Sequence, residues 1–190
     1  MKKENPRQGR TSLRRSYLVW DFRRTKRKFN LYVEVEPSFL QNCGTIYRMK
    51  NEIRKLSKEE FPLKLFEIPE PPEELYIEGV LPDEDEYKFL TVVGSRKFSS
   101  YGKEACEKLI AGLEGQKIII ISGLALGTDT NAHESALKAK LKTIAIPGSG
   151  LSRKVIHPHS NKILADKIVY AGGALLSELE PEMPAGLHTF

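Results

Sequence analysis

The chain of 190 residues has few cysteines and no long apolar run. Its two cysteines, Cys43 and Cys106, form no CxxC pair, which excludes a disulfide framework and makes a reducing, cytoplasmic location the expected one. No apolar segment approaches the roughly 20 residues that a membrane helix needs. The basic N-terminus lacks the apolar stretch of a secretory signal. We therefore expect neither secretion nor a membrane partner.

Motifs of the common cofactor-dependent and metal-dependent enzymes are also missing. The sequence has no GxGxxG, no GxxxxGK[ST], no GxSxG and no HExxH. Asp129 and His133 lie one helical turn apart and could form half a metal site, but a helix cap beside a locally hydrogen-bonded histidine explains the same spacing. Without a third ligand or an acid–base pair, the sequence predicts no catalytic residue, no metal and no cofactor.

Positive charge is concentrated at one end of the chain. The formal net charge is +5, yet residues 1–30 carry 11 Lys and Arg against two acidic residues, a net charge of +9. The other 160 residues therefore carry a net charge of −4. Residues 1–50 are interpreted as a basic, poorly assigned N-terminal extension, of which residues 1–30 are either a solvated tail or an arm that attracts phosphates. Any nucleic-acid binding by the rest of the chain must depend on local residues.

Apolar strands and amphipathic helices alternate in the second half of the chain. Strands are expected over 89–93, 117–121, 142–146 and 173–177, and helices over 101–113, 129–140 and 161–170. Such alternation predicts parallel βαβ units, so residues 89–190 are expected to form a Rossmann-like α/β domain with a mostly parallel sheet flanked by helices. In the first helix, the apolar face is predicted at Ala105, Leu109 and Leu113.

Residues 51–88 are predicted to be a lead-in segment to this domain. Residues 68–72 form a proline-rich linker, residues 75–79 a short strand, and residues 82–86 an acidic loop.

Three strands end in small turns that contain glycine and serine. These turns are Gly94 to Arg96, Ser122 to Asp129 and Gly148 to Gly150. Since parallel strands end at the same edge of a sheet, we expect backbone N–H groups, three serine hydroxyls and the Arg96 guanidinium to converge there. Asp129 is placed to cap the following helix, and the result would be an anion site. Tight-turn geometry explains each glycine turn taken alone.

These turns and their order resemble the DNA-processing protein A (DprA/Smf) family. The resemblance is carried by five motifs in sequence: Val-Val-Gly-Ser-Arg96, Ser122-Gly-Leu-Ala-Leu-Gly-Thr-Asp129 with Ala132-His133, Gly148-Ser-Gly150, Ile156-His-Pro158 with Asn161, and Gly173-Ala-Leu-Leu-Ser-Glu178. A segment that begins at Phe61-Pro and continues through Ile68-Pro-Glu-Pro-Pro resembles the family's lead-in to its Rossmann-like domain. The resemblance covers about residues 51–190.

The resemblance implies a non-enzymatic, cytosolic protein that binds single-stranded DNA. Members of the family act in natural transformation, where they load the RecA recombinase onto incoming DNA, usually as homodimers. We add Lys97 and Lys162 from charge and position. The predicted DNA- and phosphate-binding residues are Gly94, Ser95, Arg96, Lys97, Ser122, Gly123, Gly127, Asp129, Gly148, Ser149, Gly150, Asn161 and Lys162.

The chain departs from the family pattern at three places. Thr128 stands where the family commonly has Ile, and His157 replaces the usual Tyr before Pro158. The sequence ends where the family continues into an Arg-Asn-Arg motif and further strands, so we expect a domain that is truncated at its C-terminus, with an unpaired sheet edge. Two alternatives stay open: a nucleotide-processing enzyme of the lysine-decarboxylase-like (LOG) type, and an inactive truncated copy.

Overall fold

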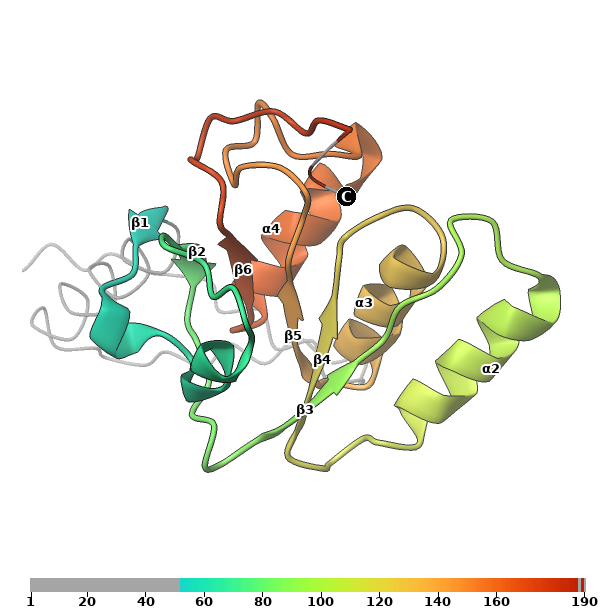
Figure 1. Ribbon diagram of the computed structural model, residues 1–190. Coiled ribbons are helices and arrows are strands. Elements are labelled where there is room, and N and C mark those ends of the chain that lie inside the picture. The colour runs from blue at the N-terminus through green and yellow to red at the C-terminus, as the bar shows by residue number, and fades with distance from the viewer. Residues whose placement is uncertain (1–51, 188, 190) are drawn as a thin grey trace, which may run out of the picture. The chain divides into compact units, whose positions relative to one another are not determined.

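The computed structural model describes residues 52–187 and 189, so the predicted basic extension lies outside the described residues (Figure 1). Within them the chain forms one six-stranded sheet in the order β1-β2-β6-β5-β4-β3. The strands are β1 (Arg54–Lys55), β2 (Tyr76–Gly79), β3 (Lys88–Thr91), β4 (Ile118–Ser122), β5 (Lys142–Ala145) and β6 (Ala174–Ser177). Strands β3, β4, β5 and β6 are parallel to their neighbours in this set. The Rossmann-like prediction is therefore confirmed.

Three α-helices connect the parallel strands. They are α2 (Ser100–Ala111), α3 (Thr128–Lys138) and α4 (Lys162–Tyr170), each starting or ending within three residues of the predicted range. The N-cap of helix α2 is Ser99, whose Oγ accepts a hydrogen bond from the Gly102 amide at 3.1 Å.

The predicted apolar face of α2 is wrong at one position. Leu109 is 72% exposed, whereas the neighbouring Ile110 is 2% exposed and packs with Ile120 of β4. Cys106 and Ile110 of the helix, and Leu113 in the turn just after it, pack into the core. This set is also spaced at three and four residues, so periodicity alone did not decide which stripe faces inward.

The two faces of the sheet are covered by different kinds of structure. In β6, Leu175 packs against α4, while Ala174 and Leu176 pack on the opposite face. That opposite face is covered by the lead-in segment, with its two short 3-10 helices, Lys58–Glu60 and Leu63–Glu67. Neighbouring residues of β6 face opposite sides of the sheet because successive side chains alternate along a strand.

The lead-in segment also extends the sheet. Strand β2 pairs antiparallel with β6, with Tyr76 opposite Ser177 and Gly79 opposite Ala174. Glu78 of β2 is 6% exposed, and both of its carboxylate oxygens accept hydrogen bonds from Arg153, at 2.7 and 2.9 Å. Burial raises the pKa of the Glu78 carboxyl, and the hydrogen bonds from Arg153 oppose only part of that effect. The sheet is therefore mixed: strand pairing joins the lead-in to it, and a partly buried ion pair joins β2 to the loop after β5.

Among the described residues, every helix is too short or too polar to cross a lipid bilayer.

Candidate nucleic-acid interface

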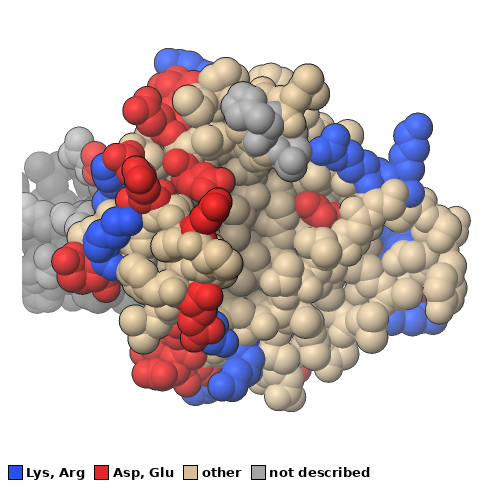
Figure 2. All heavy atoms as spheres, viewed as in Figure 1, with Lys and Arg blue, Asp and Glu red and all other residues tan. Residues whose placement is uncertain are grey.

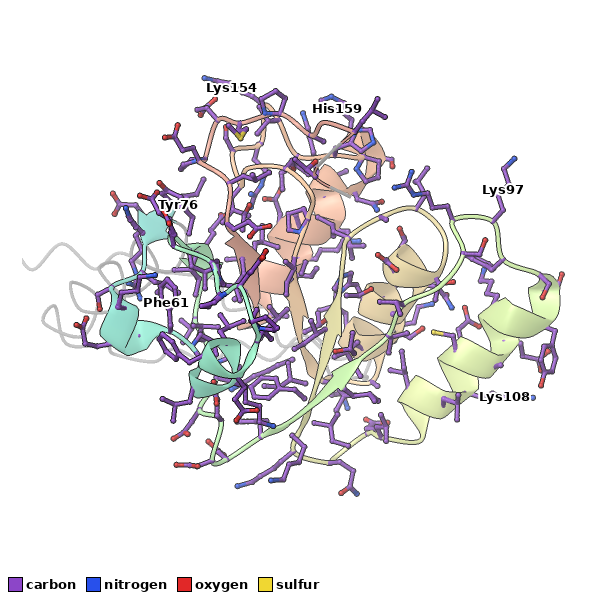
Figure 3. All side chains as sticks on the ribbon, viewed as in Figure 1. Phe61, Tyr76, Lys97, Lys108, Lys154 and His159 are labelled. Atoms are coloured by element: carbon purple, nitrogen blue, oxygen red, sulfur yellow. The ribbon has the colours of Figure 1, made fainter. Side chains whose placement is uncertain are left out.

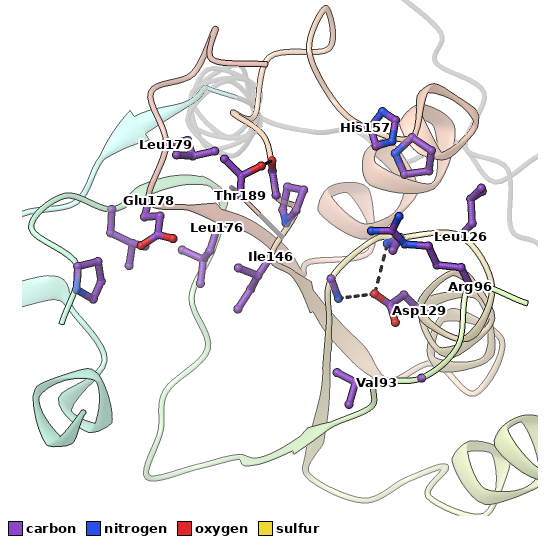
Figure 4. Close-up of a pocket in the computed structure, with 18 of the residues that line it drawn as sticks. Val93, Arg96, Leu126, Asp129, Ile146, His157, Leu176, Glu178, Leu179 and Thr189 are labelled. Atoms are coloured by element: carbon purple, nitrogen blue, oxygen red, sulfur yellow. Dashed lines mark hydrogen bonds between the residues drawn. The ribbon is translucent and has the colours of Figure 1, made fainter. Parts of the chain in front are cut away.

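A pocket of about 590 Å³ lies at the carboxyl ends of the parallel strands (Figure 4). Gly94, Gly123 and Gly148, which follow β3, β4 and β5, all line it. The predicted convergence of the three turns at one edge is therefore confirmed. Parallel strand direction explains it, because every strand of such a set delivers its following turn to the same side.

The loop after β4 binds a carboxylate from its own chain. Asp129 Oδ2 accepts hydrogen bonds from the Gly123 amide at 3.1 Å and from the Ala125 amide at 3.3 Å, both drawn as dashed lines in Figure 4. Asp129 is 8% exposed. Two of the amides expected to cradle an external anion are thus already paired within the chain, which contradicts the prediction that these two are open to a ligand.

The predicted helix cap at Asp129 is also wrong. Helix α3 starts at Thr128, and its N-cap is Gly127, which has a φ of +81°. Asp129 instead occupies the second helical position, where the helix dipole favours a carboxylate. A Cβ at Gly127 would lie 2.5 Å from the Arg96 carbonyl oxygen and closer still to that of Ser95, so only glycine fits there.

The loop after β4 and the turn after β3 are joined by hydrogen bonds. Both the amide and the Oγ1 of Thr128 donate to the Ser95 carbonyl oxygen, each at 3.1 Å. An isoleucine at this position, the residue common in the family, would supply the amide but no hydroxyl. The departure at Thr128 therefore adds a contact between the two segments.

The predicted convergence of three serine hydroxyls is wrong. Ser122 Oγ donates to the Val92 carbonyl at 2.7 Å, and Ser149 Oγ donates to the Gly150 carbonyl at 3.0 Å. Ser95 Oγ bonds the backbone of Lys97, donating to its carbonyl and accepting from its amide. Each hydroxyl thus bonds to the backbone of the chain, and none of the three serines is among the described residues that line the pocket.

Two further predicted residues, Asn161 and Gly150, have structural contacts, and a third, Lys162, lies outside the pocket lining. Asn161 is buried, and its Nδ2 donates to the Leu124 carbonyl and to Thr130 Oγ1, each at 2.8 Å. Gly150 is buried against the backbone of residues 180 and 181. Lys162 is half-buried at the first position of α4 and does not line the pocket.

The exposed cations of the site lie in the turn after β3. Arg96 and Lys97 are both exposed, and Arg96 lines the pocket. Figure 4 shows Arg96 on the same side of the pocket as Asp129 and His157, while Figure 3 shows Lys97 extending away from the fold into solvent. Of the predicted residues, Arg96 is thus the cation in contact with the pocket.

His133 belongs to the core beneath this site. It is fully buried, with Nδ1 2.7 Å from Thr143 Oγ1, and burial lowers the pKa of its imidazole to about 4. Thr143 donates its single proton to the Ile120 carbonyl, so it accepts from His133 Nδ1–H. The described residues contain no cluster of three His, Cys, Asp or Glu side chains arranged to hold a metal ion. The locally hydrogen-bonded histidine, rather than half a metal site, is what the fold contains.

Several pocket residues were not predicted. Glu178 follows β6 by one residue, so the rule that placed the three turns at one edge could have identified it. The same rule does not identify the pocket wall that the lead-in segment forms, because the position of that wall depends on the antiparallel pairing of β2 with β6. The unpredicted residues that line the pocket include Leu65, Ile68, Leu75, Leu126, Ile146, His157, Leu176 and Glu178.

Residues 52–190 match the family model described as DNA recombination-mediator protein A. The chain belongs to this family. The matched range contains Gly94–Arg96, Ser122–Asp129 and Gly148–Gly150. This confirms the resemblance found in the sequence.

Two curated relatives share 44% and 31% of their aligned residues with this chain. The DNA processing protein DprA of Streptococcus pneumoniae is 44% identical over 133 residues, covering 67% of this chain and 44% of the relative. Protein Smf of Borreliella burgdorferi is 31% identical over 167 residues, covering 87% of this chain and 50% of the relative. The chain spans about half the length of these curated relatives.

Solved structures of two DprA proteins share the fold. The Helicobacter pylori protein, described for its single-stranded DNA binding mode, superposes with a TM-score of 0.64 at 28% identity over 74% of this chain and 61% of that one. The Streptococcus pneumoniae protein superposes with a TM-score of 0.64 at 35% identity, over 80% of this chain and 52% of that one.

Proposed function

We propose that this chain is the Rossmann-like part of a recombination mediator that binds single-stranded DNA along the pocket edge of its sheet. The observation that carries the proposal is the family's Gly-Ser-Arg motif, which brings the exposed Arg96 to a pocket at the carboxyl ends of the parallel strands. A guanidinium at the rim of such a pocket suits a phosphodiester backbone.

The family also supports the finer parts of the proposal. We infer a role in DNA uptake, loading of a RecA-type recombinase onto the bound strand, and a homodimeric assembly. The protein acts by binding rather than by catalysis. Within the predicted set, Arg96 and Lys97 are the DNA contacts, whereas Ser122, Ser149, Gly150 and Asn161 hold the turns in place.

Fluorescence anisotropy with a labelled single-stranded oligonucleotide of mixed sequence tests the proposal. We expect binding that weakens as salt rises, and a loss of about tenfold in affinity with a shallower salt slope for Arg96→Ala. Lys117→Ala is the matched control, since it removes the same charge just before β4, at the opposite end of the strands, and should leave affinity nearly unchanged.

Two outcomes would contradict the proposal. Binding that survives Arg96→Ala but disappears when residues 1–30 are deleted would place DNA affinity in the basic extension. Release of free base from a nucleoside monophosphate, abolished by a pocket substitution, would instead favour the nucleotide-processing alternative.

A further inference from the structure

The turn after β3 carries its cations on a stretch of chain that has no buried side chain. Every residue from Val93 to Ser100 is exposed. In the space-filling view of Figure 2, Lys and Arg side chains stand out from the surface at the upper right, where Figure 3 labels Lys97. A segment with so little apolar burial is held only weakly by packing, so its position depends on its hydrogen bonds.

Thr128, the first residue of α3, supplies two of these hydrogen bonds to one atom of the turn. Its amide and its Oγ1 both donate to the Ser95 carbonyl oxygen, each at 3.1 Å. The Thr128 side chain also lies against Gly94, where a Cβ would come within 2.7 Å of Oγ1 and 2.9 Å of Cγ2. Thr128 therefore holds the two residues that immediately precede Arg96.

The residue that follows Arg96 is tied to the same point. Ser95 Oγ donates to the Lys97 carbonyl at 2.7 Å and accepts from the Lys97 amide at 3.0 Å. The backbone on both sides of Arg96 is thus joined through Ser95, and Ser95 is joined to α3 through Thr128.

The hydroxyl is the part of this contact that depends on the residue type. Any residue except proline would supply the amide of position 128, whereas isoleucine, the residue common in the family, has no side-chain donor. Ordering an exposed segment when a ligand binds costs free energy, and a segment that is already held in the free protein avoids part of that cost.

We propose that Thr128 is a positioning residue for DNA binding, whose hydroxyl holds the turn so that Arg96 is already in place before the strand arrives. This inference rests on the proposed function, because it takes Arg96 as a contact to the phosphates. Thr128 itself touches the turn and not the strand.

Thr128→Val tests the proposal, since valine keeps the branched shape and the amide but lacks the hydroxyl. Fluorescence anisotropy with the single-stranded oligonucleotide of mixed sequence should show binding weakened by about threefold. Thr128→Ser keeps a hydroxyl and should retain the affinity of the unmodified chain. Affinity that is unchanged in Thr128→Val would overturn the positioning role.

Thr91→Val is the matched control. It removes the same hydroxyl from an exposed residue at the end of β3, just before the turn. Urea unfolding of each variant should show that the chain is folded under the conditions of the binding assay. The affinity of Thr91→Val should equal that of the unmodified chain.

A double-mutant cycle with Arg96→Ala separates positioning from a general structural effect. If the hydroxyl acts through Arg96, Thr128→Val should lower affinity by about threefold in the unmodified chain and should change it little when Arg96 is already alanine. The same threefold loss in both backgrounds would overturn the proposal, because the effect would not pass through Arg96.

The positioning role and the proposed function fail in different ways. Binding that depends on Arg96 but not on the Thr128 hydroxyl would overturn the positioning role and leave the proposed function standing. Binding that is unchanged by Arg96→Ala would overturn both.

Discussion

The loop after β4 and the turn after β3 lie side by side at the same pocket, yet they use their polar groups differently. In the loop, the amides of Gly123 and Ala125 are bound by Asp129, and the Leu124 carbonyl is bound by Asn161. In the turn, Arg96 and Lys97 are exposed. The longest of the sequence motifs therefore uses its polar groups to hold its own backbone, whereas the shorter Gly-Ser-Arg motif leaves two cationic side chains exposed at the surface.

The largest expected effect comes from Gly127, where loop and turn touch. Gly127→Ala would place a Cβ against the carbonyl oxygens of Ser95 and Arg96 at a φ of +81°. We expect a loss of about 4 kcal/mol in the free energy of unfolding, measured by urea denaturation.

Gly115→Ala separates backbone strain from this clash. Gly115 has a φ of +82°, and a Cβ there meets nothing within 4 Å. Its replacement should cost only about 1 kcal/mol, the conformational penalty alone. Equal losses at the two glycines would mean that loop and turn do not depend on close packing.

The next effect concerns His133, buried beneath the loop. The pKa of its imidazole is about 4 in the folded chain, against an ordinary value of 6.5 that applies to the unfolded chain. Between pH 4 and pH 6.5 the unfolded chain therefore binds the proton more readily than the folded chain. Stability should therefore be unaffected by this group above pH 7 and should fall by about 2 kcal/mol between pH 7 and pH 5, as urea unfolding can measure.

His133→Gln should remove that part of the pH dependence, because glutamine does not titrate. If the variant does not fold, the imidazole proton resonances of the unmodified chain provide a second measurement. A His133 that titrates near pH 6.5 in the folded protein would contradict the buried, neutral state.

A smaller effect is expected at Asn161, which ties the loop to α4. Asn161→Ala leaves the buried Leu124 carbonyl without its donor and should cost about 1.5 kcal/mol of unfolding free energy. Lys162→Ala, next in the chain, should change stability by less than about 0.5 kcal/mol. A large loss of DNA affinity in stable Asn161→Ala protein would instead make Asn161 a ligand contact.

The sequence was sufficient to predict the parallel strands, the helices that alternate with them along the chain, and the edge of the sheet at which the turns meet. These follow from short-range periodicity and from the geometry of parallel sheets, as Gly94, Gly123 and Gly148 illustrate. The direction of individual polar groups could not be predicted. Whether Ser122 faces the pocket or the Val92 carbonyl is decided by packing across strands, which local spacing does not contain.

The lead-in wall of the pocket was unpredictable for a related reason. Residues 68–72 were interpreted as a linker on the strength of their prolines, yet Ile68 and Pro72 line the pocket. Their position is fixed by the pairing of β2 with β6, a contact between distant parts of the chain.

That pairing also decides when the pocket comes into existence. The partners of β2 lie roughly a hundred residues further along the chain, so the contact is among the most non-local in the fold and forms slowly. During synthesis, Leu75 and its neighbours leave the ribosome long before β6 is available to pair with them. The lead-in wall is synthesised before the rest of the pocket but reaches its final position only when β6 has been made. A nascent chain can therefore contain the whole Arg96 turn well before the pocket beside it is closed.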